Sequence, residues 1–342
     1  MARRLERWVT YAAAAAAIAS LMPLAAKLGW AFELASHFRV QYVVVDALLA
    51  VVLAAQRKLV LSLLLAACTA LSASVVLPYV PLGAASLAAP TAPAGAGGPA
   101  GTARPVTPTG AATALPGPTI KLLSANVLFR NHSAERLLEI VRRESPDVVV
   151  LIEYTPEWAQ MVDELRAAYP HRLEGPGSGA YGIALFSRLE LASATPFDLG
   201  DVSEIEARVL TPSGPLTLFA VHLRSPTTPW RGAMRNRQLD ELAARVARVA
   251  GPVVVIGDFN VTPYSPYFSH WLARTGLTDT RRGRTLSPSW PTLLPIVAIP
   301  IDHCAVSKDV TIVAHRSLPA FGSDHYPILA ELALRPPASS QN

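Results

Sequence analysis

The chain has 342 residues, of which 51% are apolar and only 16% are charged, against about 25% charged in a typical soluble domain. Its net charge of +5 comes from the first 118 residues, which hold eight basic and three acidic side chains; the 22 basic residues that follow are balanced by 22 acidic ones. Nucleic acid is therefore not favoured as a partner, because proteins that bind DNA phosphates usually carry a basic patch or domain.

Three apolar segments in the first 81 residues predict membrane spans. Residues 8–26 and 59–81 carry no formal charge and are long enough to cross a hydrocarbon core of about 30 Å. Between them, residues 40–55 form a shorter span that is interrupted by Asp46. Its carboxylate is expected to face another helix or to lie near the interface, with a functional intramembrane role as the alternative. A cleaved signal peptide would explain the first segment but not the other two.

The basic residues of the short loops predict the orientation of these spans. Arg3, Arg4 and Arg7 precede the first span, and Arg57 and Lys58 separate the second from the third. With three spans, both groups lie on the cytoplasmic side. The rest of the chain then faces the periplasm or the cell exterior, as a multi-pass protein of the inner or plasma membrane. The orientation reverses if the middle span does not insert.

The chain divides into four predicted regions. They are a membrane anchor over residues 1–81, a linker over 82–118, a folded domain over 119–334 and a disordered tail over 335–342. The linker is dense in Pro, Gly, Ala and Thr, a composition that cannot bury enough apolar surface to fold.

Short apolar strands alternate with helical stretches in the folded domain. The predicted strands are 120–123, 147–152, 182–186, 216–222, 253–256, 303–307 and 328–332. Residues 134–143 and 235–249 carry apolar side chains at three- and four-residue spacing, which predicts helices. Mixed strands and helices of this kind indicate a layered α/β domain.

Polar residues recur where these strands end. They are Asn126, Glu153, His222, Asp258 with Asn260, Asp302 with His303, and Asp324 with His325. A single polar residue at a strand end is typical of a turn, but six such groups in this order indicate a site. The oxygen atoms of the carboxylates and amides suit Mg²⁺ or Mn²⁺ rather than zinc. Together with histidines, they supply what metal-assisted phosphoester hydrolysis requires.

The order of "SANV", "LIE", "ALFSR", "VHL", "GDFN", "IDHCAVS" and "GSDHYP" resembles the endonuclease/exonuclease/phosphatase superfamily. Its members include DNase I-like nucleases, inositol-polyphosphate phosphatases and neutral sphingomyelinases. The resemblance covers roughly residues 119–334. It implies a four-layer α/β sandwich, in which two packed sheets are flanked by helices, here preceded by about three transmembrane helices.

The resemblance also implies how a metal ion would be held. Glu153, helped by Asn126, would bind the catalytic Mg²⁺, with Mn²⁺ as the alternative ion. Asp324 would support either the metal or His325. Many nucleases of the family carry an acidic residue where this chain has Leu128, so a second metal contact is not expected there.

The remaining matched residues would act on water and phosphate. Asp258 and Asn260 would position or activate the attacking water, and His222 would contact the scissile phosphate. His325 would pair with Asp302 as an acid/base or phosphate-stabilising dyad. The base is assigned jointly to Asp258 and His325.

Residues near these motifs are weaker candidates. His303 matches no catalytic position of the family and is predicted to be structural. Arg224 and Arg235 are candidates for binding an anionic substrate through their guanidinium groups, although a solvated loop and helix face explains them as well. Tyr264 is a candidate for the rim of the site.

The combination of spans, linker and folded domain resembles a bacterial subgroup of the superfamily, some of whose members are associated with resistance to glycopeptide antibiotics such as teicoplanin. The leading hypothesis is a Mg²⁺-dependent phosphatase that acts on an envelope lipid phosphate or an isoprenoid pyrophosphate, with the lipid bilayer as its partner and no protein partner. The alternatives are a tethered nuclease acting on DNA, a phospholipase C of the sphingomyelinase type, and a non-enzymatic binder of lipid phosphates.

Overall fold

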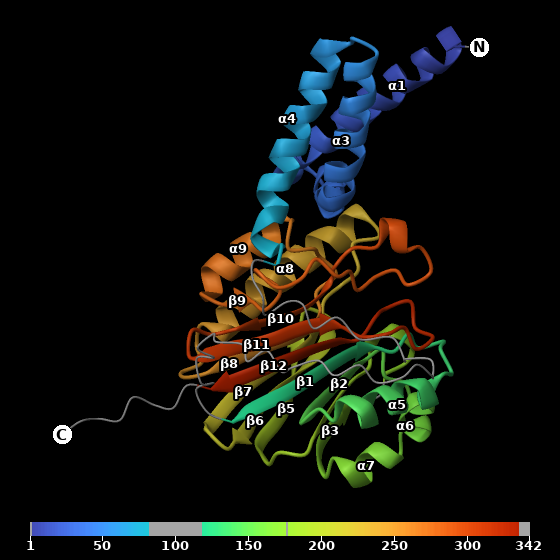
Figure 1. The fold of residues 1–342 in the computed structure, drawn as a ribbon. Coiled ribbons are helices and arrows are strands. Elements are labelled where there is room, and N and C mark those ends of the chain that lie inside the picture. Colours follow the sequence, from blue (N-terminus) through green and yellow to red (C-terminus); the bar gives the residue numbers. More distant parts are fainter. Residues whose placement is uncertain (1, 82–117, 176, 335–342) are drawn as a thin grey trace, which may run out of the picture.

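The computed structural model describes residues 2–81, 118–175 and 177–334 of the chain. Apart from Pro118, the linker predicted for residues 82–118 lies outside the described residues, as does the predicted tail. Figure 1 shows a bundle of helices standing on one end of an α/β unit. Residues 2–81 are called the anchor below, and the unit that begins at Pro118 is called the body.

The anchor is mostly helical. Its elements are α1 (Ala2–Leu21), η1 (Met22–Leu28), α2 (Trp30–Ala35), η2 (Ser36–Phe38), α3 (Arg39–Ala55), α4 (Leu59–Val76) and η3 (Leu77–Tyr79), where η denotes a 3-10 helix. Three stretches are long and apolar enough to cross a membrane: Glu6–Leu28, Trp30–Ala55 and Leu59–Tyr79. The middle stretch is longer than the sequence indicates, because α2 and η2 extend it toward its N-terminus.

Polar side chains inside the anchor face neighbouring helices. Asp46 is fully buried, and its Oδ2 accepts a hydrogen bond from Ser20 Oγ at 2.5 Å. Arg39 Nη1 donates to Ser72 Oγ at 3.3 Å. Asp46 therefore faces another helix, which is one of its two expected positions.

Two six-stranded sheets form the centre of the body. The order in the first sheet is β11 (Val310–Ser317), β12 (Ile328–Leu334), β1 (Thr119–Asn126), β2 (Val148–Ile152), β4 (Ile183–Ser187) and β3 (His171–Gly175). The order in the second sheet is β5 (Leu191–Leu199), β6 (Val202–Thr211), β7 (Gly214–His222), β8 (Val253–Asp258), β10 (Asp302–Val306) and β9 (Thr278–Asp279). One central pair in each sheet is parallel, β1 with β2 and β7 with β8.

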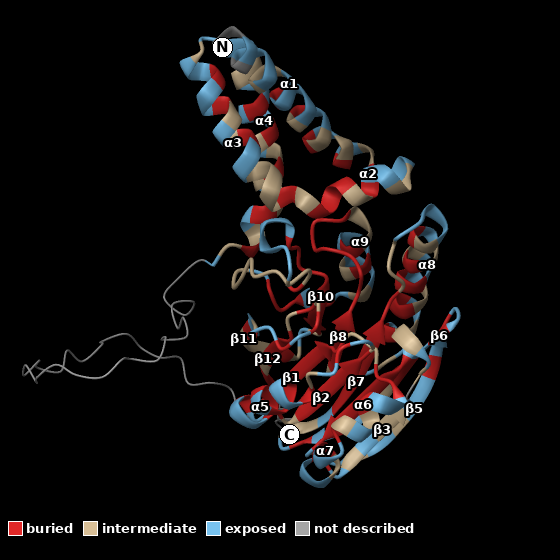
Figure 2. Cartoon of the chain, turned by 90° about the vertical axis from the view of Figure 1, so that its right-hand side faces the viewer, coloured by how far each residue is buried: buried red, intermediate tan, exposed pale blue. Residues whose placement is uncertain are grey.

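Apolar side chains from both sheets fill the space between them. Ile120 and Val150 of the first sheet belong to the same buried cluster as Ile205, Leu218 and Ile256 of the second. Inward-facing side chains of this kind hold two sheets face to face. Figure 2 shows the central strands as almost entirely buried.

Helices cover the outer face of each sheet. The first sheet is covered by α5 (Ala134–Glu144), α6 (Pro156–Met161) and α7 (Glu164–Ala168). The second sheet is covered by α8 (Pro229–Val246) and α9 (Pro266–Thr275). The predicted four-layer α/β sandwich is confirmed.

The anchor packs directly on the body through α2 and η2, which lie above α8 and α9 in Figure 2. Glu33 Oε1 forms an ion pair with Arg235 Nη2 at 2.9 Å, and both side chains are almost completely buried. His37 Nδ1 lies 3.0 Å from Thr262 Oγ1. These contacts join residues that are about 200 positions apart in the sequence, so the two parts form one continuous structure.

Candidate active site

The polar residues predicted from the strand ends meet at one edge of the two sheets. Asn126 ends β1 and Glu153 follows β2, while His222 ends β7 and Asp258 ends β8. Each pair of strands is parallel, so the carboxyl ends of its two strands lie side by side. Asp302 begins β10 directly opposite Asp258 in an antiparallel pair. The topology therefore brings both sheets to a common site.

Asn126 links the two sheets at this site. Its Nδ2 donates to Glu153 Oε1 and to Asp258 Oδ2, both at 3.2 Å. Its Oδ1 accepts a hydrogen bond from the Leu128 backbone N–H at 3.0 Å. The amide therefore separates the half-buried carboxylate of Glu153 from the buried one of Asp258, which would otherwise repel each other.

Glu153 is held in an uncommon backbone conformation. Its φ is 62°, in the left-handed region that non-glycine residues rarely adopt. The Phe129 backbone N–H donates to its Oε2 at 3.1 Å, and the next residue, Tyr154, donates its N–H to Gly182 O at 2.9 Å. Burial raises the pKa of Glu153 above its usual value. Strained residues of this kind often lie at functional sites.

The chain does not turn at Gly257 of "GDFN" but two residues beyond the end of β8. Gly257 stays within the strand, with φ 147°, opposite His303 of β10. A Cβ atom at Gly257 would lie 1.9 Å from Val221 O, so glycine allows β7 and β8 to approach closely. The chain bends at Asn260, whose φ is 50°.

Asn260 holds Asp258 in position. Its backbone N–H donates to Asp258 Oδ1 at 2.9 Å, and its Nδ2 donates to Leu223 O at 2.9 Å. Burial and the neighbouring charge of Asp302 raise the pKa of Asp258.

His325 and Asp302 form a buried dyad beside Asp258. His325 Nδ1 lies 2.9 Å from Asp302 Oδ2, and its Nε2 lies 3.8 Å from Asp258 Oδ2. Burial opposes a charge on the imidazole, but the Asp302 and Asp258 carboxylates outweigh it and raise the pKa of His325. The protonated form, with Nδ1–H donating to Asp302, is favoured.

His222 lies on the other side of Asp258 and has the opposite character. Its Nε2 is 3.7 Å from Asp258 Oδ2. Burial and the nearby charge of His325 lower the pKa of His222 to about 4, so this imidazole is neutral near pH 7. The two histidines thus offer one charged and one neutral ring to the same carboxylate.

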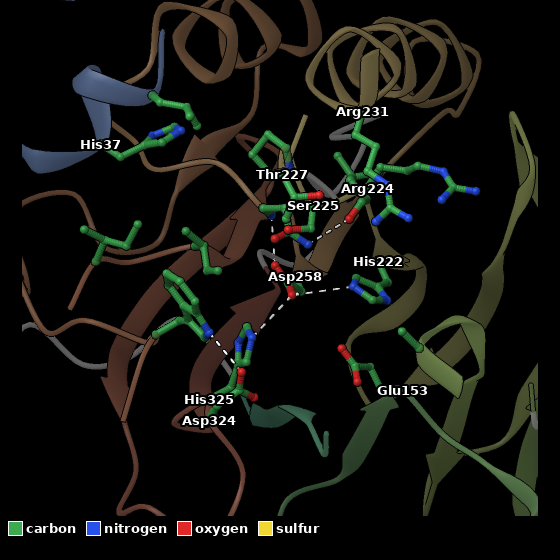
Figure 3. Close-up of a pocket in the computed structure, with 18 of the residues that line it drawn as sticks. His37, Glu153, His222, Arg224, Ser225, Thr227, Arg231, Asp258, Asp324 and His325 are labelled. Atoms are coloured by element: carbon green, nitrogen blue, oxygen red, sulfur yellow. Dashed lines mark hydrogen bonds and ion pairs between the residues drawn. The ribbon is translucent and has the colours of Figure 1, made fainter. Parts of the chain in front are cut away.

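Most of these residues line a cavity of about 410 Å³, although Asn126 and Asp302 do not. Figure 3 shows Glu153, His222, Asp258, Asp324 and His325 around it, at strand ends and in the loop before β12. Asp324 Oδ2 accepts a hydrogen bond from Trp290 Nε1 at 3.0 Å. The remaining lining includes the apolar residues Leu34, Phe38, Trp290, Ile299 and Ile301 and the polar residues His37, Asn260, Arg224 and Arg231.

Two of the predicted substrate-binding residues lie elsewhere. Arg235 is fully buried, pairs with Glu33 and donates from Nη1 to Asn260 O at 2.6 Å, so its guanidinium group is not available to a substrate. Tyr264 packs edge-on against Tyr79 of the anchor, with ring centroids 5.8 Å apart, and it does not line the cavity. Both predictions are corrected by these contacts.

The positions of the other two weaker candidates, Arg224 and His303, are compatible with their predicted roles. Arg224 lines the cavity, where its Nε donates to Asp201 Oδ1 at 2.9 Å and its Nη1 to the Tyr181 hydroxyl at 2.7 Å. His303 stacks on Phe268 with ring centroids 4.3 Å apart, and this packing fits a structural role.

Two features of the site are not evident in the sequence. Glu204 of β6 is fully buried, accepts a hydrogen bond from the His222 backbone N–H at 2.7 Å, and has a pKa raised by burial and by Asp258. In β6, the alternating residues Ile205, Ala207 and Val209 face the other sheet, so the pattern places Glu204 on the outer face of its own sheet. The pattern does not reveal that helices cover this outer face. Leu34 and Phe38 of the anchor have no local signal at all.

The donor groups fit a divalent cation. The carboxylates of half-buried Glu153 and buried Asp258 both accept hydrogen bonds from the neutral amide of Asn126, and a hard cation would stabilise such a pair of negative charges. The Oδ1 of Asn126 accepts a hydrogen bond from the Leu128 N–H. In this arrangement Asn126 therefore supports the two carboxylates and does not offer its own oxygen to the cation. Ligand atoms of Asp258, Asp302 and His325 also lie within 4.8 Å of one another, but the protonated imidazole of His325 has no free lone pair for a metal ion, so the ion is assigned to the side of the site that carries Glu153.

Comparison with known proteins agrees with the fold and the motifs. A family described as the "Endonuclease/Exonuclease/phosphatase family" matches residues 123–325. The structure is similar to that of an endonuclease/exonuclease/phosphatase from Beutenbergia cavernae DSM 12333, with 24% identity and a TM-score of 0.53 over 65% of this chain and 73% of that one. No curated protein matches the chain.

Two eukaryotic structures show the same architecture. D. rerio TDP2 complexed with a single-strand DNA product has 19% identity and a TM-score of 0.53, over 63% of this chain and 99% of that one. The human Nocturnin catalytic domain with a bound sulfate anion has 18% identity and a TM-score of 0.53, over 63% and 94%. At these identities the likeness concerns the fold alone.

Proposed function

We infer the function of this chain from the family to which it belongs, the endonuclease/exonuclease/phosphatase family. It is a metal-dependent phosphoester hydrolase. We propose, more specifically, that it is a membrane-anchored enzyme whose site faces the periplasm or the cell exterior. Its proposed substrate is an envelope lipid phosphate or an isoprenoid pyrophosphate, which agrees with its resemblance to the teicoplanin-resistance-associated subgroup.

The composition of the cavity carries this proposal. Its lining combines the carboxylates and imidazoles described above with apolar residues, Leu34 and Phe38 from the anchor and Ile299 and Ile301 from the body. A cavity that combines polar groups with apolar walls suits an amphiphilic ligand. Because part of the apolar wall belongs to the anchor, this composition supports a phosphoester that carries a lipid chain.

The arrangement of the anchor supports the proposed orientation. The N-terminal end of α1 and the turn between α3 and α4, which carries Arg57 and Lys58, lie at the end of the bundle far from the body (Figure 1). Basic residues of short loops favour the cytoplasmic side. This rule therefore favours an extracytoplasmic body.

The chain's own residues suggest how the reaction proceeds. Asp258, held by Asn260, accepts a proton from the attacking water. The imidazolium of His325, kept charged and oriented by Asp302, stabilises negative charge on the phosphoryl group. Neutral His222 donates a hydrogen bond to a phosphoryl oxygen. A bound Mg²⁺ (or Mn²⁺), which Glu153 would hold, would supply further positive charge and lower the pKa of water.

Phosphate release from undecaprenyl pyrophosphate tests the proposed function. We expect Asp258→Asn in the full-length protein to lower the rate by at least about 100-fold. The matched control is Asp198→Asn on the exposed surface of β5, which should stay within about twofold of wild type. Equal rates for wild type and Asp258→Asn would contradict the proposal.

The same preparations separate the alternative substrates. Plasmid DNA and sphingomyelin are offered with Mg²⁺ in parallel reactions. Plasmid cleavage without phosphate release would favour the tethered nuclease, and headgroup release from sphingomyelin would favour the phospholipase. Binding of lipid phosphate with no turnover of any substrate would favour the non-enzymatic binder.

A further inference from the structure

The connection between β9 and β10 exposes an unusual amount of apolar surface. Residues 285–301, "TLSPSWPTLLPIVAIPI", contain no charged side chain. Within them, Leu293, Leu294, Ile296 and Val297 are 85%, 60%, 83% and 40% exposed. Contiguous exposed apolar residues in a folded protein usually mark a contact surface. Residues 293–297 are called the apolar loop below.

The base of the apolar loop is fixed to the membrane helices. Gln41 Nε2, near the start of α3, donates to Ala298 O at 3.0 Å. Leu286, like Val40 and Val43 of α3, packs against a buried cluster that contains Val76 of α4. Figure 1 shows the loop, in deep orange, at the end of the body that carries these helices. If α3 and α4 cross a bilayer, the loop lies at the level where they leave it.

The other side of the same connection reaches the active site. Trp290, Ile299 and Ile301 line the cavity. Thr292 N donates to Asp324 O at 2.9 Å, and Tyr326 N donates to Ser289 O at 2.7 Å. The residues on both sides of His325 are thus fastened to the connection. The same connection therefore carries both the exposed apolar loop and three residues of the cavity wall.

We propose that residues 293–297 insert into the interfacial region of the bilayer beside α3, so that the cavity receives a lipid-linked phosphoester directly from the membrane. The delivery of a lipid-linked substrate rests on the proposed function, whereas the insertion of residues 293–297 into the bilayer does not. Three observations favour lipid over a protein partner as the occupant: the absence of charge in residues 285–301, the continuity of the loop with α3 and α4, and its position beside the cavity. Apolar side chains next to a membrane helix are stabilised by entering the acyl boundary.

Lipid contact is tested on the full-length protein in phosphatidylcholine and phosphatidylglycerol vesicles. Ile296→Cys is labelled with an environment-sensitive fluorophore; both native cysteines, Cys68 and Cys304, are buried. The matched control is Leu210→Cys, which is 37% exposed on β6. We expect spin-labelled lipid to quench the label at position 296 but not at 210. A label at 296 that lipid does not quench, or that is shielded only as protein concentration rises, would overturn the proposal, and the second result would assign the loop to contact between two copies.

Turnover tests the consequence for the substrate. Leu293→Ser combined with Ile296→Ser should lower kcat/KM for undecaprenyl pyrophosphate in vesicles by about tenfold or more. Hydrolysis of soluble bis(p-nitrophenyl) phosphate should remain within about twofold, since the loop does not line the catalytic groups. Equal losses on both substrates, or no loss on either, would overturn the delivery role. If wild type hydrolyses neither substrate, the proposed function fails, while the quenching result still decides lipid contact.

Discussion

At the scale of single residues, the site depends on three backbone conformations that few residue types adopt. Glu153 and Asn260 both have positive φ, and each is held there by hydrogen bonds to neighbouring strands and loops. Gly257 lies in a conformation and at a distance from Val221 that other residues cannot share. These three positions determine where the carboxylates of Glu153 and Asp258 point.

Replacing Gly257 should disrupt the site through a steric clash. Gly257→Ala places a Cβ 1.9 Å from Val221 O, so β7 and β8 must separate where they carry His222 and Asp258. Gly214 also has positive φ, 121°, but its added Cβ would meet nothing within 4 Å. We expect Gly214→Ala to cost about 1–3 kcal/mol from backbone strain, and Gly257→Ala to cost at least about 2 kcal/mol more. Thermal unfolding of the two variants in detergent measures the difference; equal costs would contradict the clash.

Replacing Glu153 should weaken metal binding selectively. Glu153→Gln removes one of the two carboxylates that accept hydrogen bonds from Asn126, so the Mg²⁺ concentration for half-maximal rate should rise by about tenfold or more. EDTA should abolish the activity of both proteins, and excess Mg²⁺ should restore it. The control is Glu157→Gln, an exposed carboxylate at the start of α6. A Mg²⁺ requirement unchanged by Glu153→Gln would exclude Glu153 as a metal-binding group.

Single residues could be predicted where a motif joins them to a strand end. Asn126, Glu153 and Asp258 were predicted to share a site, and they lie together because parallel strands align their ends. Arg235 could not be assigned correctly, because its partner Glu33 belongs to a distant segment. From sequence alone, a basic side chain near a site motif cannot be told apart from one that is already paired with a distant acidic residue.

At the scale of elements, strands were predictable when both their faces are buried. All residues of β2, β4 and β8 are buried, and such strands appear in sequence as uninterrupted apolar runs. The missed strands are β3, β5, β6, β9 and β11. In β5 most residues are exposed or half-buried, so polar side chains break the apolar pattern. Edge strands of this kind receive their conformation from pairing more than from local sequence.

A buried ion pair joins α2 to α8, beside the contact of Trp30 with Gly232. Glu33 Oε1 forms an ion pair with Arg235 Nη2 at 2.9 Å and accepts a hydrogen bond from Ser265 Oγ at 2.9 Å. Glu33→Ala leaves the guanidinium group buried without its carboxylate, which should cost about 3–5 kcal/mol. The midpoint temperature of thermal unfolding in detergent should fall by about 10 °C.

A surface pair on the same helix provides the control. Arg237 and Glu241 pair at 2.8 Å on the exposed side of α8, and Glu241→Ala should cost only about 0.3–0.5 kcal/mol. Combining Glu33→Leu with Arg235→Met should recover most of the lost stability, because it leaves no unpaired buried charge. Equal effects of Glu33→Ala and Glu241→Ala would show that the ion pair does not hold the anchor on the body.

At the scale of the whole molecule, the anchor is part of the cavity as well as a tether. The sequence predicts a linker between two independent parts, whereas α2 and η2 pack on the body and supply Leu34 and Phe38 to the cavity wall. This docking depends on side chains that meet only after both parts have folded. No periodicity or motif in residues 27–39 could predict it.

The topology of the molecule decides which substrates the cavity can meet. Only an odd number of spans places the body opposite the basic ends of the anchor, so a cysteine in the body and one in the turn between α3 and α4 should differ in accessibility. In intact cells, a membrane-impermeant maleimide should label Arg208→Cys on β6, which is exposed. It should not label Ala55→Cys at the end of α3 until the membrane is permeabilised. Labelling of only Ala55→Cys would place the active site in the cytoplasm and remove extracytoplasmic lipid phosphates from the candidate substrates, while the phosphoester chemistry of the site would stand.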